Sequence, residues 1–330
     1  MTTVLDHPDA IVRIEECGGG RREISVEAKD RAFIPVRRWE TAYPPDLVEH
    51  VLRVKGLYVA DEIMRDEAPF YVEHHFKWDI LSYVDRADFT ERRLLDFGCG
   101  SGASTVVLAR MLPDSTQFTG VELVPEFVEL ARHRARYHGI DTRAAFHLSP
   151  GPRRLPEEMG QVDFVLFSAV YEHLLEPERR EMLPLVWRHL KPGGILFLDQ
   201  TPYRWFPIEM HTTGLPLINY LPDSVAHWTA RRFSSRVGSG ESWEQLLRRG
   251  IRGGTIREIL SVLNKTGRSA DLLMPSRQGV QDHIDLWFQL SSTVRARFAK
   301  RLMKWGFRAV KASTGISLIP TLSLAFRKVR

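Results

Sequence analysis

The sequence predicts an α/β fold built on a doubly wound, seven-stranded and mostly parallel sheet. From residue 92 onward, short apolar runs alternate with longer stretches of helical periodicity, which is typical of a parallel sheet covered by helices. A glycine-rich turn joins the first run to the first helix, and an acidic residue closes the second run. Such sheets bind ligands at the carboxyl ends of their strands, so we expect the functional site there.

The elements follow one another in a regular order. Predicted strands occupy residues 94–97, 117–122, 144–148, 162–168, 195–199, 270–274 and 319–326. Predicted helices occupy residues 46–55, 70–84, 103–112, 126–138, 177–190, 255–264 and, as one or two helices, 281–311. Strand and helix alternate up to residue 199, and the alternation resumes after a long insertion.

Some segments lie outside this alternation. Residues 1–90 begin with a glycine-rich, charged stretch and continue into predicted helices, which indicates an N-terminal helical extension or lid. Residues 91–330 form the main domain. Within it, we expect the insertions at about 201–254 and 277–312 to recognise the substrate, because inserted segments often carry recognition on a rigid scaffold.

Cysteine usage and hydropathy indicate a cytoplasmic protein. The two cysteines, Cys17 and Cys99, lie far apart and outside any Cys-x-x-Cys pair, so neither a disulfide framework nor a zinc site is predicted. The N-terminus lacks the basic and apolar regions of a signal peptide. In addition, no apolar run reaches the length that spans a membrane.

The charges are distributed unevenly between the two parts of the chain. Residues 1–200 carry 25 Lys and Arg against 33 Asp and Glu, whereas residues 201–330 carry 21 against 8. The basic part could meet nucleic acid, an acidic small molecule or an anionic membrane, or it could form a solvated basic face. Charge alone leaves these alternatives open.

The turn after the first strand carries the glycines Gly98, Gly100 and Gly102. A backbone without Cβ atoms can turn tightly there and approach a ligand at the start of the next helix. Glu122 ends the second strand, 20 residues after Gly102, where a carboxylate can accept hydrogen bonds from both ribose hydroxyls. Together these residues predict a nucleoside cofactor, although the glycine spacing also fits a dinucleotide.

Asp96 separates the two classes of cofactor. It lies two residues before Gly98, where a carboxylate would repel a pyrophosphate but attract the ammonium and sulfonium groups of S-adenosylmethionine. The alternative is an aspartate that only caps the turn. Asp96 therefore favours S-adenosylmethionine over a nicotinamide dinucleotide.

Four segments resemble motifs of class I S-adenosylmethionine-dependent methyltransferases, including those that act on small molecules, and they occur in the family's order. They are Leu94-Leu95-Asp96-Phe97-Gly98-Cys99-Gly100-Ser101-Gly102, Val121-Glu122 with Pro125-Glu126, the run 162–168 with Tyr171-Glu172-His173-Leu174, and Leu190-Lys191-Pro192-Gly193-Gly194-Ile195-Leu196. The resemblance covers about residues 94–200. It implies a Rossmann-like methyltransferase fold with S-adenosyl-L-methionine as cofactor.

The resemblance also implies which residues contact the cofactor. They are Asp96, Gly98, Cys99, Gly100, Gly102, Glu122, Leu123, Ser149 and Ser168. Ser149 departs from the family pattern, because the family usually carries an acidic residue after its third strand. A serine can still hydrogen-bond to the adenine, but without charge.

Two histidines are the predicted catalytic residues. Methyl transfer from a sulfonium depends mainly on positioning, but a hydroxyl acceptor also benefits from a nearby base, for which histidine is suited. His173 follows the fourth strand, and His211 lies in a polar and aromatic loop after the fifth. We expect Tyr171, Tyr203 and Arg204 to contact the acceptor. For each histidine, a structural role in capping, packing or an ordinary loop is the alternative.

A metal is not predicted at this site. Glu172-His173 resembles half of the Glu-x-x-Glu-His metal site of some methyltransferases, but Ala169 stands in place of the first Glu. A hard cation such as magnesium needs several oxygen ligands, so the remaining half is insufficient.

Residues 295–311 form a basic amphipathic segment. It holds seven basic residues and no acidic one, interleaved with apolar side chains. The basic residues are Arg295, Arg297, Lys300, Arg301, Lys304, Arg308 and Lys311. Either the apolar side folds onto the domain and the basic side is solvated, or the segment lies on the inner face of an anionic membrane.

The sequence therefore predicts methyl transfer, and the expected reaction is O-methylation of a small molecule, a sugar or a lipid-linked saccharide. RNA is a less favoured substrate, because no RNA-binding module is recognisable. A non-catalytic subunit that binds the cofactor is a further alternative. A nicotinamide-dependent oxidoreductase is the least favoured, because of Asp96 and the later motifs.

Overall fold

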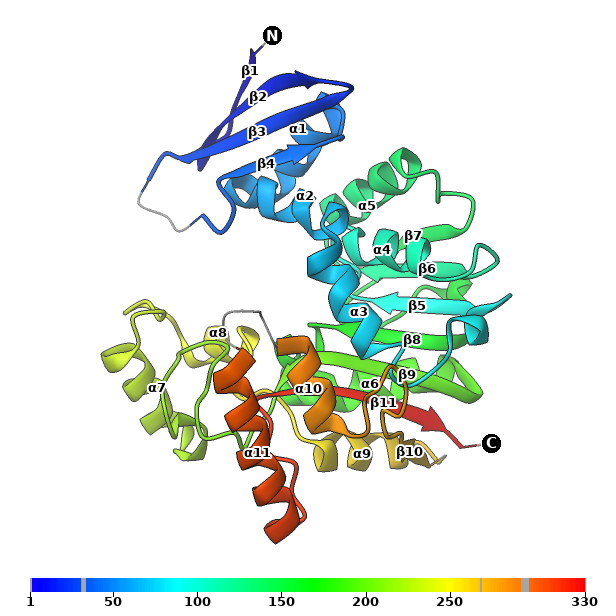
Figure 1. Cartoon of the computed structure of the whole chain (residues 1–330), viewed down its shortest axis with the longest axis vertical. Coiled ribbons are helices and arrows are strands. Elements are labelled where there is room, and N and C mark those ends of the chain that lie inside the picture. Colours follow the sequence, from blue (N-terminus) through cyan, green and yellow to red (C-terminus); the bar gives the residue numbers. More distant parts are fainter. Residues whose placement is uncertain (1, 31–33, 268, 292–296, 330) are drawn as a thin grey trace.

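A computed structural model describes residues 2–30, 34–267, 269–291 and 297–329 of the chain. Its larger sheet has the strand order β10-β11-β9-β8-β5-β6-β7 (Figure 1). These strands are β5 (Arg93–Phe97), β6 (Gln117–Glu122), β7 (Ala144–Leu148), β8 (Val162–Ser168), β9 (Leu190–Pro202), β10 (Ala270–Leu272) and β11 (Thr321–Lys328). The strands β5 to β9 run parallel, whereas β10 and β11 are antiparallel additions at one edge. The predicted doubly wound, seven-stranded and mostly parallel sheet is confirmed.

Neighbouring residues of the central strands face opposite sides of the sheet. Leu94 of β5 and Phe164 of β8 belong to one buried apolar cluster, and the next residues, Leu95 and Val165, belong to another. The first cluster includes side chains of α3 (His74–Asp79), α4 (Ala103–Met111) and α5 (Pro125–Tyr137), and the second those of α6 (Glu176–His189) and α9 (Ile256–Asn264). Because helices cover both faces of the sheet, most residues of these strands are buried, and their sequences are nearly continuously apolar.

The N-terminal part holds a small sheet that the sequence analysis did not anticipate. Its four strands, in the order β1-β2-β3-β4, are all antiparallel: β1 (Thr2–Asp6), β2 (Ala10–Gly18), β3 (Arg21–Ala28) and β4 (Arg38–Thr41). One face packs on α1 (Pro45–Lys55) and α2 (Val59–Glu67), where Val12, Ile14 and Ile24 are buried with Leu47. The extension is therefore helical only in its second half. The missed signal is the alternation of apolar and charged residues on both sides of the turn at 18–20.

The predicted helix at 70–84 is shorter than expected. One π-helical turn, η2 (Pro69–Glu73), leads into α3, which ends at Asp79. The chain then turns back on the sheet, where the Tyr83 hydroxyl donates a hydrogen bond of 2.7 Å to the Ser323 carbonyl of β11. This contact holds Tyr83 against β11, so the chain does not continue as a helix after Asp79.

The two predicted insertions flank the main sheet. The first contains η6 (Ile218–Tyr220), α7 (Asp223–Phe233) and α8 (Trp243–Arg248), which share an apolar cluster of their own. The second contains α10 (His283–Ser291) and α11 (Arg297–Thr314), while Arg295 of the predicted basic segment lies outside the described residues. Within the described ranges, no helix is both long and apolar enough to cross a bilayer.

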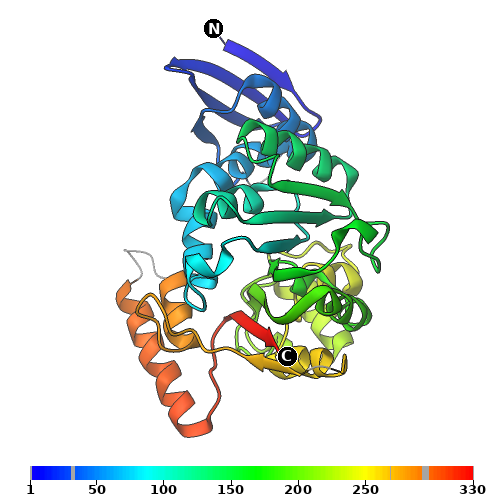
Figure 2. The same cartoon turned by 90° about the vertical axis from the view of Figure 1, so that its right-hand side faces the viewer.

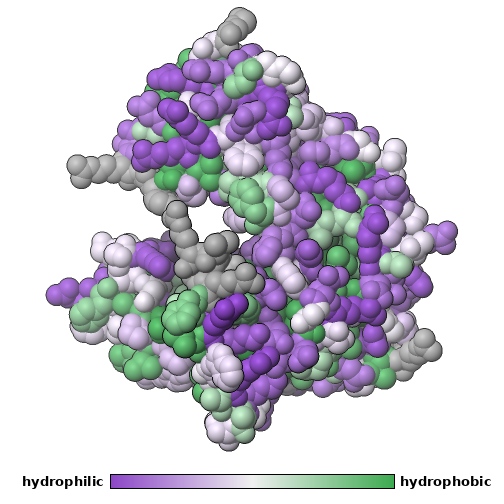
Figure 3. Space-filling view, viewed as in Figure 1, coloured by the Kyte–Doolittle hydropathy of each residue, from purple (hydrophilic) through white to green (hydrophobic). Residues whose placement is uncertain are grey.

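The carboxyl ends of the parallel strands face a hollow in the molecular surface. The N-terminal sheet with α1 and α2 borders one side of it, and the segment with α7 and α8 borders the other (Figures 1 and 3). The view from the side shows the N-terminal sheet stacked beyond α5 at one end of the molecule (Figure 2). The fold thus places both additional segments around the edge where parallel sheets bind ligands.

Candidate active site

The loop from β5 to α4 requires its glycines. Gly98, Gly100 and Gly102 have φ values of 70°, 53° and 81°, a backbone region that other residues rarely adopt. A Cβ on Gly98 would lie 2.8 Å from Val170 Cγ2, and a Cβ on Gly102 would lie 2.8 Å from Ala131 Cβ. The loop therefore packs closely against Val170, which follows β8, on one side and against α5 on the other.

Glu122 ties the end of β6 to the glycine loop. Its Oε2 accepts a hydrogen bond of 3.0 Å from the Gly100 amide. Its Oε1 accepts from the amides of Leu123, at 2.6 Å, and Val124, at 3.2 Å. The side chain of Leu123 is half exposed beside it. The acid thus lies at the carboxyl edge next to the glycines, as the predicted cofactor contact requires.

Asp96 is buried at the carboxyl end of β5. Burial raises the pKa of its carboxyl group to about 7, although Thr105 Oγ1 donates a hydrogen bond of 2.7 Å to Oδ2 and opposes this shift. A cation beside Asp96 would favour the ionised form. The position fits a group that binds an ammonium or sulfonium.

Three other predicted cofactor residues use their side chains within the protein. Cys99 is buried, and a Cβ on Gly120 would lie only 2.8 Å from its Sγ, so this side chain fills space beside β6. Ser149 Oγ donates to the carbonyls of Gly151 and Arg154, at 2.9 and 2.6 Å, and so stabilises its own turn. Ser168 Oγ lies 3.3 Å from Asp199 Oδ2.

A buried ion-pair network behind the glycine loop was missed by the sequence analysis. Arg134 of α5 is fully buried and donates to the carbonyl and hydroxyl of Ser101, at 3.0 and 2.7 Å, and to Glu62 Oε1, at 3.2 Å. Ser101 Oγ also donates to Glu62. Burial opposes ionisation of Glu62, but Arg134 and Lys55 outweigh it and lower its pKa to about 2. Since Glu62 lies on α2, this network fixes the N-terminal extension to the glycine loop.

The acceptor side begins directly after β8, in η5 (Tyr171–His173). His173 Nδ1 lies 2.7 Å from the Arg248 carbonyl, which can only accept, so Nδ1 carries the proton and Nε2 the lone pair. This Nε2 lies 3.7 Å from Glu172 Oε1. The ring of His211 lies beside it, with a centroid distance of 5.8 Å. The structure therefore brings the two predicted catalytic histidines together.

The position of His211 depends on Glu209, which the sequence analysis did not single out. The buried Glu209 carboxylate accepts hydrogen bonds from the amides of His211, Thr212 and Thr213, at 2.9, 2.8 and 2.6 Å. These contacts close the loop after β9 into a compact turn. Burial lowers the pKa of both His173 and His211, so both rings are neutral near pH 7.

Glu172 is completely buried beneath the two histidines. Its Oε2 lies 3.3 Å from Thr201 Oγ1, whereas Oε1 has no hydrogen-bond partner among the described residues. Burial raises the pKa of this carboxyl group to about 8. Sequence reasoning noted Glu172 only as part of an incomplete metal motif.

The comparisons with known proteins concern the central part of the chain. Residues 94–194, which include the glycine loop, Asp96 and Glu122, match the family model of a methyltransferase domain. This part of the chain is thus similar to class I S-adenosylmethionine-dependent methyltransferases. The resemblance stated from the sequence is confirmed, and S-adenosyl-L-methionine is the cofactor of this family.

Curated relatives match the same part of the chain. The ubiquinone biosynthesis O-methyltransferase of Xanthomonas oryzae pv. oryzae (strain PXO99A) is 33% identical over 122 residues, covering 36% of this chain and 47% of the relative. The ribosomal protein L11 methyltransferase of Shewanella pealeana is 27% identical over 119 residues, covering 36% and 37%. This chain thus spans less than half of either relative. A solved O-methyltransferase family protein from Burkholderia thailandensis aligns with a TM-score of 0.42 at 16% identity, over 65% of this chain and 56% of that one.

The three predicted acceptor contacts lie apart from one another. The ring of Tyr171 is completely buried, and its hydroxyl donates a hydrogen bond of 2.9 Å to Glu258, so the side chain packs within the core. Tyr203 lines a cavity of about 160 Å³ together with His211. Arg204 lines a different cavity, of about 880 Å³, at the starts of α6, α8 and α9. Only Tyr203 therefore shares a cavity with a predicted catalytic residue.

Proposed function

We propose that this chain transfers a methyl group from S-adenosyl-L-methionine to an oxygen of a small molecule, a sugar or a lipid-linked saccharide. One observation carries the proposal: the helical turn that holds His173, with His211 beside it, follows directly after a residue that packs against the cofactor loop. Val170, which packs against Gly98, immediately precedes the helical turn that holds His173. A neutral imidazole next to the reacting methyl group can accept the proton of a hydroxyl acceptor.

Two groups of residues would take part in this reaction: one orients the cofactor, and the other holds the proton of the acceptor. When bound, S-adenosyl-L-methionine supplies a methyl group on a sulfonium, an activated leaving group. Asp96 and Glu122 are placed to orient it at the glycine loop. His173 Nε2 carries a lone pair, because Nδ1 donates to the Arg248 carbonyl, and it is placed to hold the proton that the acceptor hydroxyl loses. The ubiquinone relative is named as an O-methyltransferase, which also supports oxygen as the methylated atom.

Cofactor binding is the first test. Isothermal titration of the full chain with S-adenosyl-L-homocysteine is expected to give a dissociation constant in the micromolar range, and titration with NAD is expected to give no heat of binding. Binding of NAD without binding of S-adenosyl-L-homocysteine would contradict the proposed function. Methyl transfer to a panel of phenols, sugars and saccharide lipids then identifies the acceptor class. Turnover by the purified chain alone would exclude a non-catalytic partner subunit, and strongly salt-dependent RNA binding would favour RNA instead.

We also propose that α11 lies on an anionic membrane surface, where the chain meets its methyl acceptor. Phe298, Leu302 and Trp305 are spaced along one side of α11, and 75%, 59% and 75% of their surfaces are exposed. The described helix carries six basic residues and no acidic one. An exposed apolar row on a basic helix matches a helix that lies in the interface of an anionic bilayer.

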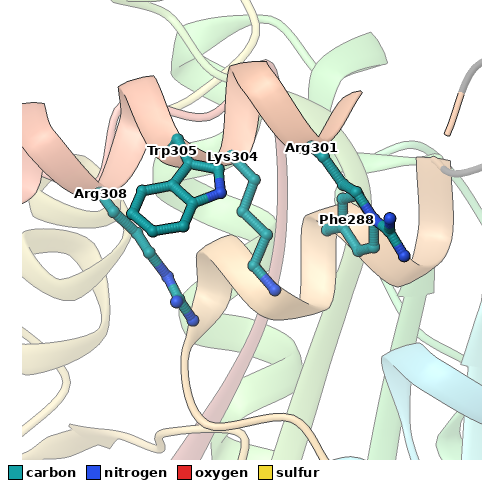
Figure 4. A pocket seen from close by; sticks show the side chains of 5 residues that line it. All are labelled: Phe288, Arg301, Lys304, Trp305 and Arg308. Carbon is teal, nitrogen blue, oxygen red and sulfur yellow. The ribbon is translucent and has the colours of Figure 1, made fainter. Parts of the chain in front are cut away.

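Only part of the apolar side of α11 folds onto the domain. Phe307 packs against Trp287 of α10, whereas the apolar row stays exposed. Lys304 and Arg308 point toward α10, where both pair with Asp285, at 2.6 and 2.7 Å (Figure 4). They line a hollow of about 320 Å³ together with Arg301, Trp305 and Phe288, which suits a phosphate headgroup. Two basic side chains of α11 thus pair with α10, while Arg301 and the apolar row are exposed.

Sedimentation with lipid vesicles tests this contact. The chain is expected to sediment with vesicles that contain phosphatidylglycerol and not with vesicles of phosphatidylcholine alone. Replacing Leu302 and Trp305 by Ser should abolish sedimentation, whereas the matched exposed pair Trp228 and Phe233 on α7 should tolerate the same change. Equal sedimentation of both double variants, or none of the wild type, would contradict the proposal.

A further inference from the structure

Three potential metal ligands from two distant segments converge beside the proposed reaction centre. Glu172 and His173 lie on η5, and His211 comes from the loop after β9. One ligand atom of each lies within 4.8 Å of the others, and His173 Nε2 lies 3.7 Å from Glu172 Oε1. These separations are close to those between ligands of one ion, whose bonds are each about 2.0–2.2 Å long.

An independent observation points into the centre of this triad. Glu172 is completely buried, and its Oε1, the atom that faces His173, has no hydrogen-bond partner in the described parts of the chain. A buried carboxylate oxygen without a partner is unfavourable, and such groups are usually paired or bound to a metal. A cation between the three side chains would supply the missing partner.

The surrounding residues hold the donor atoms as an outer shell does in metal sites. His173 Nδ1 donates to the Arg248 carbonyl, which turns the lone pair of Nε2 toward Glu172, and Thr201 Oγ1 contacts the other Glu172 oxygen. Gly250 keeps the space open, because a Cβ there would lie 2.9 Å from His211 Cδ2 and 3.1 Å from Glu172 Cγ. The φ of Gly250, +90°, disfavours any other residue as well.

We propose that Glu172, His173 and His211 bind a divalent transition-metal ion such as Zn²⁺ or Co²⁺. Two imidazole nitrogens and one carboxylate oxygen suit these ions, whereas Mg²⁺ prefers oxygen ligands throughout. The site therefore differs from the magnesium site that the sequence analysis considered and rejected, because it does not need the carboxylate missing at Ala169. Instead, it recruits His211, whose closeness to Glu172 only the fold reveals.

The metal site restricts which acceptors can react, because their hydroxyl must reach the ion. This consequence rests on the proposed function. Three protein ligands leave at least one position open on the ion, as in catalytic zinc sites. With the ion bound, His173 Nε2 is a ligand, so the ion takes over the role proposed above for this lone pair. A hydroxyl of the acceptor bound to the ion would release its proton to solvent more readily, because a divalent cation stabilises the resulting anion. We therefore expect acceptors whose methylated hydroxyl can reach the ion, such as phenols or vicinal diols.

Cobalt binding tests the site without any need for the acceptor. The untagged full chain is stripped with EDTA and titrated with Co²⁺, and visible absorption is recorded. We expect the absorption bands of protein-bound Co²⁺ at one ion per chain, and their loss when Zn²⁺ is added. Glu172→Gln, His173→Ala and His211→Ala should each weaken Co²⁺ binding by about 100-fold or more, given that even outer-shell changes cost 10–100-fold.

His227→Ala is the matched control. His227 lies on α7 in the same insertion as His211, and its Nε2 lies 2.8 Å from the Glu241 carbonyl, outside the triad. This variant should bind Co²⁺ like the wild type. Because His211 is exposed, His211→Ala is expected to fold even if Glu172→Gln does not.

Titration with S-adenosyl-L-homocysteine is run on the same samples. Normal binding of this product with no Co²⁺ site, or with a Co²⁺ site that survives His211→Ala, overturns the metal inference and leaves the proposed function intact. A Co²⁺ site in a chain that binds no S-adenosyl-L-homocysteine overturns the proposed function and leaves the metal site. Loss of Co²⁺ binding in the triad variants alone supports the inference.

Discussion

The cofactor side and the acceptor side of the candidate active site are built in different ways. On the cofactor side, the glycine loop and Glu122 come from consecutive elements, β5 to β6, and a buried ion pair between Arg134 and Glu62 supports them from behind. On the acceptor side, His173 and His211 come from separate segments and meet over Glu172. The cofactor side is a local motif that is recognisable in sequence, whereas the acceptor side exists only after folding.

Of the variants considered, replacing His173 is expected to have the largest effect. It should lower turnover on the acceptor side without changing cofactor binding. Removing a general base costs about 10²–10⁴-fold in turnover, so His173→Ala should lower kcat in that range. The affinity for S-adenosyl-L-homocysteine should not change, because the ring does not belong to the glycine loop. Steady-state kinetics and isothermal titration on the same variant measure both quantities. Loss of both together would indicate structural damage and would remove the division between the two sides.

Arg134→Met tests the support of the cofactor side. The variant leaves Glu62 buried without its main partner, so the free energy of unfolding should fall by about 3–5 kcal/mol. Lys55→Met removes the partly exposed second partner, 3.4 Å away, and should cost only about 0–1 kcal/mol. Urea denaturation measures both. Equal losses in the two variants would mean that the buried network does not hold the extension in place.

Asp96 gives the cofactor side a dependence on pH. Its pKa is raised to about 7 by burial, so the carboxyl is mostly neutral below pH 7 and ionised above it. If the cationic cofactor binds the ionised form, affinity for S-adenosyl-L-methionine should rise about tenfold from about pH 6 to about pH 8, following the ionised fraction. Asp96→Asn should bind weakly without this rise. The same rise in the variant would assign the effect to another group.

Tyr171→Phe is expected to have the smallest effect. It removes only the hydroxyl that donates to Glu258, so the variant should lose about 1 kcal/mol of stability and keep its turnover. Thermal unfolding and kinetics of the variant measure these. A large loss of turnover would return Tyr171 to the acceptor site, where the sequence analysis had placed it.

The same contrast explains what the sequence could predict. The parallel sheet was predictable because each strand is a short apolar run followed by its own helix, as in 162–168. The N-terminal sheet was missed because its strands are half exposed, and charged residues such as Arg13 and Glu15 interrupt the apolar ones. The alternation of Val12 and Ile14 is nevertheless the pattern of such a strand.

For the candidate site, the sequence could locate residues that lie close together along the chain. Asp96 and Glu122 could be located from their distance to the glycines. The roles of Arg248 and Gly250 could not, because they act through a backbone carbonyl and an absent Cβ, which no side-chain pattern reveals. The motif likewise gives the position of Tyr171 after β8 but not the direction in which its ring points, which the structure shows to be into the core.

One measurement tests the central claim most directly: isothermal titration of S-adenosyl-L-homocysteine into the wild type and into His211→Ala. The account predicts micromolar binding to both chains, because the cofactor side is complete without the acceptor side. Absence of binding to the wild type, or binding of NAD in its place, would contradict it.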